Sequence, residues 1–161
     1  MPTETILVDS NIWLYAYAKA RQTEYEKIHL LARSFFQNLI QDSRIKMAVT
    51  SYQIAEIIDL LRKANVDKQT RIEIFEGFKN TKFTTKEIVM ADIEVCFKKS
   101  LDSGIHIYDY LVALPLKGMV SKIYSADAHL QHQDFKEIAE VENPLFPWIL
   151  VEGRKPVKEK I

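Results

Sequence analysis

The stretch ILVDSNIWLYAY, residues 6–17, decides the predicted fold because an apolar run breaks at a polar triplet and then resumes. Three apolar residues precede Asp9, and the small polar residues Ser10 and Asn11 follow it, as at a buried strand that ends where a helix begins. No lysine or arginine lies within several residues of Asp9. Asp9 is therefore either the cap of the next helix or one member of an acidic cluster that requires a cation.

Short strand-like runs alternate with helical patterns along the rest of the chain. Runs with β-branched or aromatic content predict strands over 4–8, 44–49, 121–125 and 147–152. Apolar periodicity predicts helices over 23–42, 50–64, 67–80, 84–104 and 108–118. This alternation predicts a helix-rich α/β fold with a parallel sheet of four or five strands and helices on both faces.

Local signals mark the ends of these helices. Thr23 and Thr50 each stand three positions before a Glu or Gln, which is capping-box spacing. Gly104 is placed to stop one helix, and Pro115 predicts a kink or an early end in another.

Composition bounds the class of protein. The 161 residues suffice for one compact domain, predicted over 1–153, with a loose basic tail at 154–161. Lys and Arg together equal Asp and Glu at 22 each, so any contact with nucleic acid must be local. The single cysteine, Cys96, is expected to be a buried small apolar residue. With no signal-peptide or membrane-span pattern, we expect a cytoplasmic protein that does not bind membranes.

Polar side chains follow the predicted strands. Ligands bind open parallel sheets beyond the carboxyl ends of strands, where this chain places Asp9, Thr50, Ser51, Ser125 and Asp127. Each aspartate alone is typical of a helix cap.

Two further acids extend this group. Asp109 begins an apolar helix, where the helix dipole alone would favour a carboxylate. Glu56 lies inside a helix and off its apolar stripe, so it is either a surface residue or faces the crevice with Leu60. Carboxylates held close together raise one another's pKa values unless a cation offsets their repulsion. A ligand set of oxygens, without a Cys or His pattern, indicates Mg²⁺ or Mn²⁺ as that cation.

Four segments in order resemble the acidic motifs of PIN-domain nucleases, and most of all VapC-type toxins of toxin–antitoxin pairs. They are LVDSNIW at 7–13, TSYQIAEI at 50–57, YDYLVA at 108–113 and IYSADAHL at 123–130. The resemblance spans residues 5 to about 135 and implies a three-layer α/β/α sandwich.

The resemblance also implies roles for individual residues. The catalytic, metal-binding acids would be Asp9, Glu56, Asp109 and Asp127. Small polar positions that steady the carboxylates or bound water would be Ser10, Asn11 and Ser125. The family often has a second acid shortly after the last one, whereas this chain delays it to Asp134, which we interpret as a helix cap or an outer supporting group.

The activity implied is Mg²⁺- or Mn²⁺-dependent hydrolysis of RNA by an endoribonuclease that forms a homodimer and binds an antitoxin protein. Cations placed loosely near the predicted crevice are Lys19, Arg21, Lys117 and Lys122. The aromatic residues Trp13, Tyr15 and Tyr17 are favoured as core or subunit interface over base stacking. His129 and His132 have the spacing of a zinc pair but lack a third ligand, and His106 is interpreted as a loop histidine.

Other classes remain open or fit less well. A non-catalytic PIN-like RNA-binding or scaffold protein, or a housekeeping RNA-processing or DNA nuclease, is the alternative. A haloacid dehalogenase-type phosphatase would need Asp where this chain has Asn11, and a receiver domain would need a lysine after a late strand.

Overall fold

The computed structural model describes residues 4–159, which form a five-stranded parallel sheet between two layers of helices. The strands of this sheet are β1 (Glu4–Val8), β2 (Ile45–Thr50), β3 (Phe83–Lys86), β4 (Lys122–Tyr124) and β5 (Glu140–Glu142). Their spatial order is β3-β2-β1-β4-β5. The predicted α/β class, with helices on both faces of a parallel sheet, is therefore confirmed.

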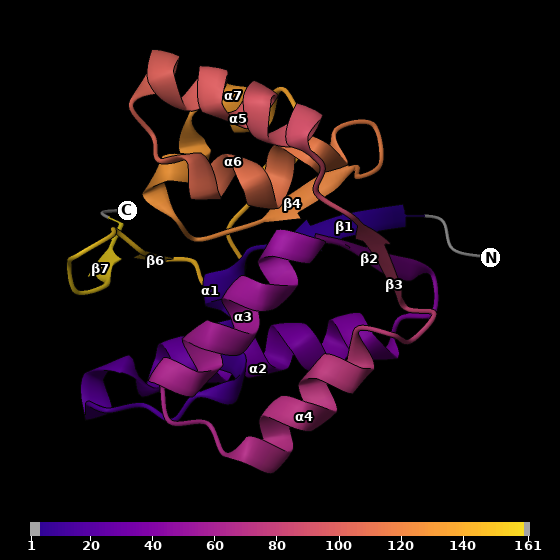
Figure 1. Cartoon of the computed structure of the whole chain (residues 1–161). Helices are drawn as coiled ribbons and strands as arrows, with labels where there is room; N and C mark the ends of the chain where they lie inside the picture. The colour runs from indigo at the N-terminus through magenta and orange to yellow at the C-terminus, as the bar shows by residue number, and fades with distance from the viewer. Residues whose placement is uncertain (1–3, 160–161) are drawn as a thin grey trace.

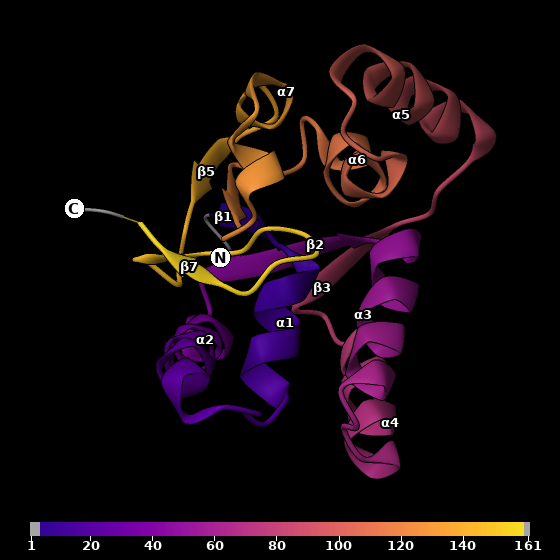
Figure 2. The same ribbon diagram turned by 90° about the vertical axis from the view of Figure 1, so that its left-hand side faces the viewer.

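The helices divide between the two faces of the sheet, as Figures 1 and 2 show. One layer contains α1 (Ser10–Tyr17), α2 (Glu26–Gln41), α3 (Ser51–Lys63) and α4 (Lys68–Gly77). The other contains α5 (Met90–Ser103), α6 (Ile107–Ala113) and α7 (Gln133–Lys136). Short 3₁₀ helices are η1 (Thr23–Tyr25), η2 (Leu114–Leu116) and η3 (Ala128–Gln131).

Each face of the sheet has its own apolar core because successive strand residues point to opposite sides. Ile6 and Val8 of β1 pack with the α1–α4 layer, whereas Leu7 between them packs with the α6 layer. Cys96 is fully buried in the second core, as predicted. Burial of both faces is what makes the central strands read as continuous apolar runs.

Several sequence predictions differ from the structure at the edges of the sheet. Residues 84–86 were assigned to a helix but form β3, which pairs with residues 47–50 of β2, and α5 begins only at Met90. The strand β5 was missed. Both are edge strands with mostly exposed or half-exposed side chains, so they lack the apolar pattern of a buried strand.

The predicted strand at 147–152 does not join the central sheet. Instead β6 (Trp148–Ile149) pairs antiparallel with β7 (Val157–Lys158) in a hairpin that contains residues 154–158 of the predicted tail, whereas residues 160–161 of that tail lie outside the described residues. Figure 1 shows this hairpin on the side of the sheet opposite the N-terminus. We call residues 150–156, which join its two strands, the C-terminal strap.

The helix-end signals have mixed outcomes. Gly104 ends α5 with a φ of 78°, a left-handed conformation that glycine adopts without strain, and α6 gives way to η2 before Pro115, as predicted. Thr50 accepts a hydrogen bond from the Gln53 backbone N–H. The capping box at Thr23 is wrong, because Thr23 opens η1 and α2 begins at Glu26.

Candidate functional site

The sheet order reverses between β1 and β4, and two of the predicted acids follow these strands. The chain passes from β1 outward to β2 and β3, and then returns to place β4 on the other side of β1. Asp9 directly follows β1, and Asp127 lies three residues after β4. Such a switch point is where open parallel sheets form a crevice for ligands.

Asp9 both caps a helix and belongs to the acidic group, so the two readings of the sequence are compatible. Its Oδ1 accepts the Ser10 backbone N–H at 2.8 Å at the start of α1, and its Oδ2 accepts the Ser125 hydroxyl at 2.7 Å. The Ser125 Oγ also accepts the Asp127 backbone N–H at 3.0 Å. Ser125 is fully buried and thus ties Asp9 to the backbone of Asp127.

The carboxyl group of Asp9 lies in an environment that opposes its charge. Burial raises its pKa to about 7, the hydrogen bond from Ser125 lowers it, and the negative charges of Asp127, Asp109 and Glu56 raise it further. Glu56, Asp109 and Asp127 line the same pocket as Asp9, so the four predicted acids lie together in space.

Glu56 faces this crevice from α3. The Ser10 hydroxyl donates to its Oε1, and the Tyr52 hydroxyl donates to its Oε2 at 2.9 Å. Glu56 and Leu60 both line the pocket that contains Asp9. Of the two readings of Glu56, the structure thus supports the residue that faces the crevice.

Asp109 enters from the first turn of α6, between two histidines. The Nδ1 of His129 lies 3.0 Å from its Oδ2, and the Nε2 of His106 lies 3.4 Å from the same oxygen. Burial raises the pKa of Asp109 to about 6, with Asp127 adding to the rise while the histidines oppose it. Asp109 thus carries the second strongly perturbed carboxyl group of the site.

Asp127 fixes the loop after β4 as well as contributing a carboxylate. Its Oδ1 accepts the His129 backbone N–H at 2.8 Å and caps η3. Burial lowers the pKa of His129, but its hydrogen bond to Asp109 and the charges of Asp127 and Asp109 raise it more. The net effect is that the pKa of His129 lies above the ordinary value for histidine.

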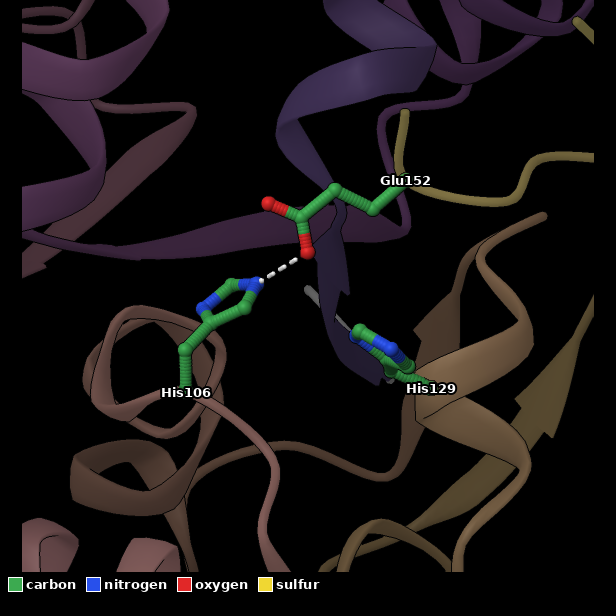
Figure 3. Close-up of side chains that lie close together, drawn as sticks. All are labelled: His106, His129 and Glu152. Carbon is green, nitrogen blue, oxygen red and sulfur yellow. Dashed lines mark ion pairs between the residues drawn. The ribbon is translucent and has the colours of Figure 1, made fainter. Parts of the chain in front are cut away.

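The acids line a pocket of about 360 Å³ that the C-terminal strap partly encloses. Leu150 anchors the strap, because its N–H donates to Ala126 and its carbonyl accepts from Ala128, at 2.9 and 3.0 Å. From the strap, Glu152 reaches across to the Nε2 of His106 at 3.0 Å, with His129 beside them (Figure 3). Glu152 and Arg154 line the pocket but were not among the predicted site residues.

The remaining predicted residues differ in their distance from the pocket. Asn11 lines it, but Asp134 does not: Asp134 accepts the Tyr110 hydroxyl at 2.7 Å and lies 3.8 Å from the Nζ of Lys99. The cap of α7 is His132, whose Nδ1 accepts the Asp134 backbone N–H. The reading of Asp134 as the helix cap was therefore wrong.

The histidines and lysines singled out in the sequence lie in different parts of the structure. His132 turns to the cap of α7 while His129 contacts Asp109, so the two histidines form no common pair. Lys122 begins β4, at the end of that strand away from the pocket, and pairs with Glu142 at 3.2 Å. Lys122 and its neighbour Lys117 were therefore wrongly placed near the crevice.

The donor set fits a hard divalent cation. Within residues 4–159 no lysine or arginine forms an ion pair with Asp9, Glu56, Asp109 or Asp127; only histidines do. Asp109 and Asp127 already form, with His129, a group whose potential ligand atoms lie within 4.8 Å of one another. Carboxylates that share a pocket without a fixed cation are suited to Mg²⁺ or Mn²⁺, which several carboxylate oxygens bind.

Comparisons with known proteins identify the fold. No protein-family model matches the sequence, and no curated protein is similar to it at a significant level. Among solved structures, the VapC20 toxin of Mycobacterium tuberculosis is similar with a TM-score of 0.63 at 13% identity, over 82% of this chain and 97% of that one. VapBC2 of Rickettsia felis is similar with a TM-score of 0.52 at 16% identity, over 86% and 98%. The chain therefore shares the fold of these structures, in agreement with the predicted PIN-like α/β/α sandwich.

None of the helices in residues 4–159 is long and apolar enough to cross a bilayer.

Proposed function

We propose that this protein is a metal-dependent endoribonuclease of the VapC type, acting as the toxin of a toxin–antitoxin pair. One observation carries the proposal: four carboxylates from four separate segments meet in one pocket, and no lysine or arginine of the described part of the chain forms an ion pair with them. Folding would not bring these negative charges together unless a bound cation offset their repulsion.

Asp9 and Asp109 are the proposed central ligands of Mg²⁺ or Mn²⁺, with Glu56 and Asp127 completing the site. When bound, such an ion lowers the pKa of water and stabilises the attacking and leaving oxygens of a phosphodiester displacement. The chain's own contribution is to hold the carboxylates. Ser125 fixes the orientation of Asp9, and Ser10 and Tyr52 fix that of Glu56.

The two histidines are proposed to tune the site rather than to replace the ion. His106 and His129 both face the Oδ2 of Asp109 and oppose the rise in the pKa of Asp109. The strap residue Glu152 holds His106 at the mouth of the pocket. These contacts support a pocket that keeps its shape before substrate and cation enter.

RNA is the proposed substrate because the fold is shared with a toxin described as cleaving the sarcin–ricin loop. A homodimer, an antitoxin partner and a cytoplasmic location follow from the same resemblance and remain predictions. Light scattering tests the first: a homodimer has twice the chain mass of 18.7 kDa.

Cleavage of RNA by the purified protein tests the function. We expect labelled RNA to be cut in Mg²⁺, with cleavage abolished by EDTA and restored by excess Mg²⁺ or Mn²⁺. The Asp9→Asn variant should be inactive, whereas Asp102→Asn, on the exposed side of α5, should cleave like wild type. Cleavage that persists in EDTA or in Asp9→Asn would contradict the mechanism.

A further inference from the structure

A second pocket adjoins the acidic pocket and shares part of its wall. Tyr15, Leu60 and Pro156 line both pockets, so the two lie side by side. The second pocket has a volume of about 400 Å³, within the range of ligand-binding sites. We call it the basic groove.

The charged side chains of the basic groove are all of one sign. Its lysines and arginine are Lys19, Arg21, Lys63 and Lys155. They come from the segment after α1, the end of α3 and the C-terminal strap, and none of the described residues that line the groove is acidic. The Nζ of Lys63 lies 3.1 Å from the Oδ2 of Asp59, outside the groove lining, so the charge of Lys63 is partly offset. The chain as a whole has equal numbers of acidic and basic residues, so the groove carries a local excess of positive charge.

Aromatic side chains lie between these cations. Tyr15 and Tyr25 line the groove and are half-exposed, which leaves ring surface available. Their rings are held by neighbours: Tyr15 packs edge-on against the buried His29 at 5.0 Å between ring centroids, and Tyr25 against Trp148 at 6.0 Å. Fixed aromatic rings among lysines and arginines are the features with which proteins bind single-stranded nucleic acid.

We propose that the basic groove binds the single-stranded RNA segment that flanks the scissile phosphodiester, with phosphates on the lysines and arginine and bases against Tyr15 and Tyr25. The proposal rests on the function proposed above. The groove adjoins the acidic pocket, which favours RNA over an acidic peptide, because one strand can then contact both the groove and the carboxylates proposed to bind the cation. Tyr15, on the shared wall, lies where the strand would pass between the two.

Binding of a fluorescein-labelled single-stranded RNA to the inactive Asp9→Asn protein in Mg²⁺ tests the groove separately from cleavage. In that background we compare Lys19→Ala/Lys155→Ala with a control of equal charge change, Lys98→Ala/Lys136→Ala, on exposed positions of α5 and α7. Fluorescence anisotropy gives Kd at several salt concentrations.

We expect the groove double variant to raise Kd about tenfold and to reduce the slope of log K against log salt by about 1.4, since each phosphate contact with a single strand contributes about 0.7. The control should match the parent protein. Tyr25→Leu, which keeps an apolar side chain against Trp148, should raise Kd about fivefold or more through lost stacking.

Equal Kd values and salt slopes in the groove and control variants would overturn the proposal, as would an acidic peptide that binds the groove while RNA does not. The parallel cleavage assay on the active protein separates this outcome from failure of the proposed function. Cleavage with unchanged kcat/KM in Lys19→Ala/Lys155→Ala would contradict the proposal that the basic groove binds RNA, and would leave the proposed nuclease activity standing. If RNA binding requires the basic groove but the wild-type protein never cleaves RNA, the proposed role of the groove is supported and the proposed nuclease activity is contradicted.

Discussion

The substitution Asp9→Asn should stabilise the metal-free protein at neutral and alkaline pH while it abolishes activity. Asp9 carries a pKa of about 7 in the folded protein, chiefly because of burial, against 3.8 for an exposed aspartate. A carboxyl group whose pKa is raised by folding favours the folded state below its unfolded pKa and loses that contribution as pH rises through the folded pKa. The loss amounts to at most about 4 kcal/mol, of which about 3 kcal/mol falls between pH 5 and pH 8.

Asparagine removes the charge and keeps most of the local bonding. Its Oδ1 still accepts the Ser10 N–H, and its Nδ2 can donate to the Ser125 Oγ, although that oxygen then serves two donors with its own hydrogen unplaced. This imperfect bond lowers the expected gain to about 2 to 3 kcal/mol at pH 8.

Urea unfolding in EDTA at pH 5 and pH 8 measures this effect as a difference between the two proteins. We expect wild type to lose stability relative to Asp9→Asn as pH rises, and Mg²⁺ at pH 8 to stabilise wild type but not the variant. A difference in free energy of unfolding that does not change with pH, or equal stabilisation of both proteins by Mg²⁺, would refute the reasoning that Asp9 is a buried charge that a cation stabilises.

Three other substitutions test the surrounding contacts. Ser125→Ala removes a hydrogen bond that lowers the pKa of Asp9, so the pH at which cleavage reaches half its maximum should rise. The free energy of unfolding should fall by about 1 to 3 kcal/mol. An unshifted pH–rate profile would contradict this prediction. Tyr52→Phe should lower kcat/KM about fivefold by freeing Glu56, whereas Tyr108→Phe, which leaves that bond intact, should not. Glu56→Gln should abolish cleavage with little change in urea midpoint, and a large stability loss would show a structural role instead.

The inner strands β1, β2 and β4, and the acids that follow β1 and β4, were predictable because local sequence controls them. A buried parallel strand must be apolar on both faces, and the residue after it must reach the carboxyl edge of the sheet. That placed Asp9 and Asp127 correctly, and the helical position of Glu56 left only two directions for its side chain. The convergence with Asp109 came from family resemblance, since no local pattern predicts which helix end meets a strand end far along the chain.

The features that were missed depend on contacts between distant segments. The strands β3 and β5 are edge strands, so partner strands rather than apolar periodicity define them. The strap reaches the pocket because Leu150 pairs with residues 126–128, a contact that the local sequence does not encode. The pairing of His106 with Glu152 depends on that placement.

Anomalous diffraction from crystals soaked in Mn²⁺ tests the central claim most directly, because it locates the cation without relying on activity. We predict a peak within the pocket, bounded by carboxylate oxygens of Asp9 and Asp109, that disappears in crystals of Asp9→Asn. A pocket without a peak, or an equal peak in both proteins, would contradict the claim that these acids are held together to bind a divalent ion.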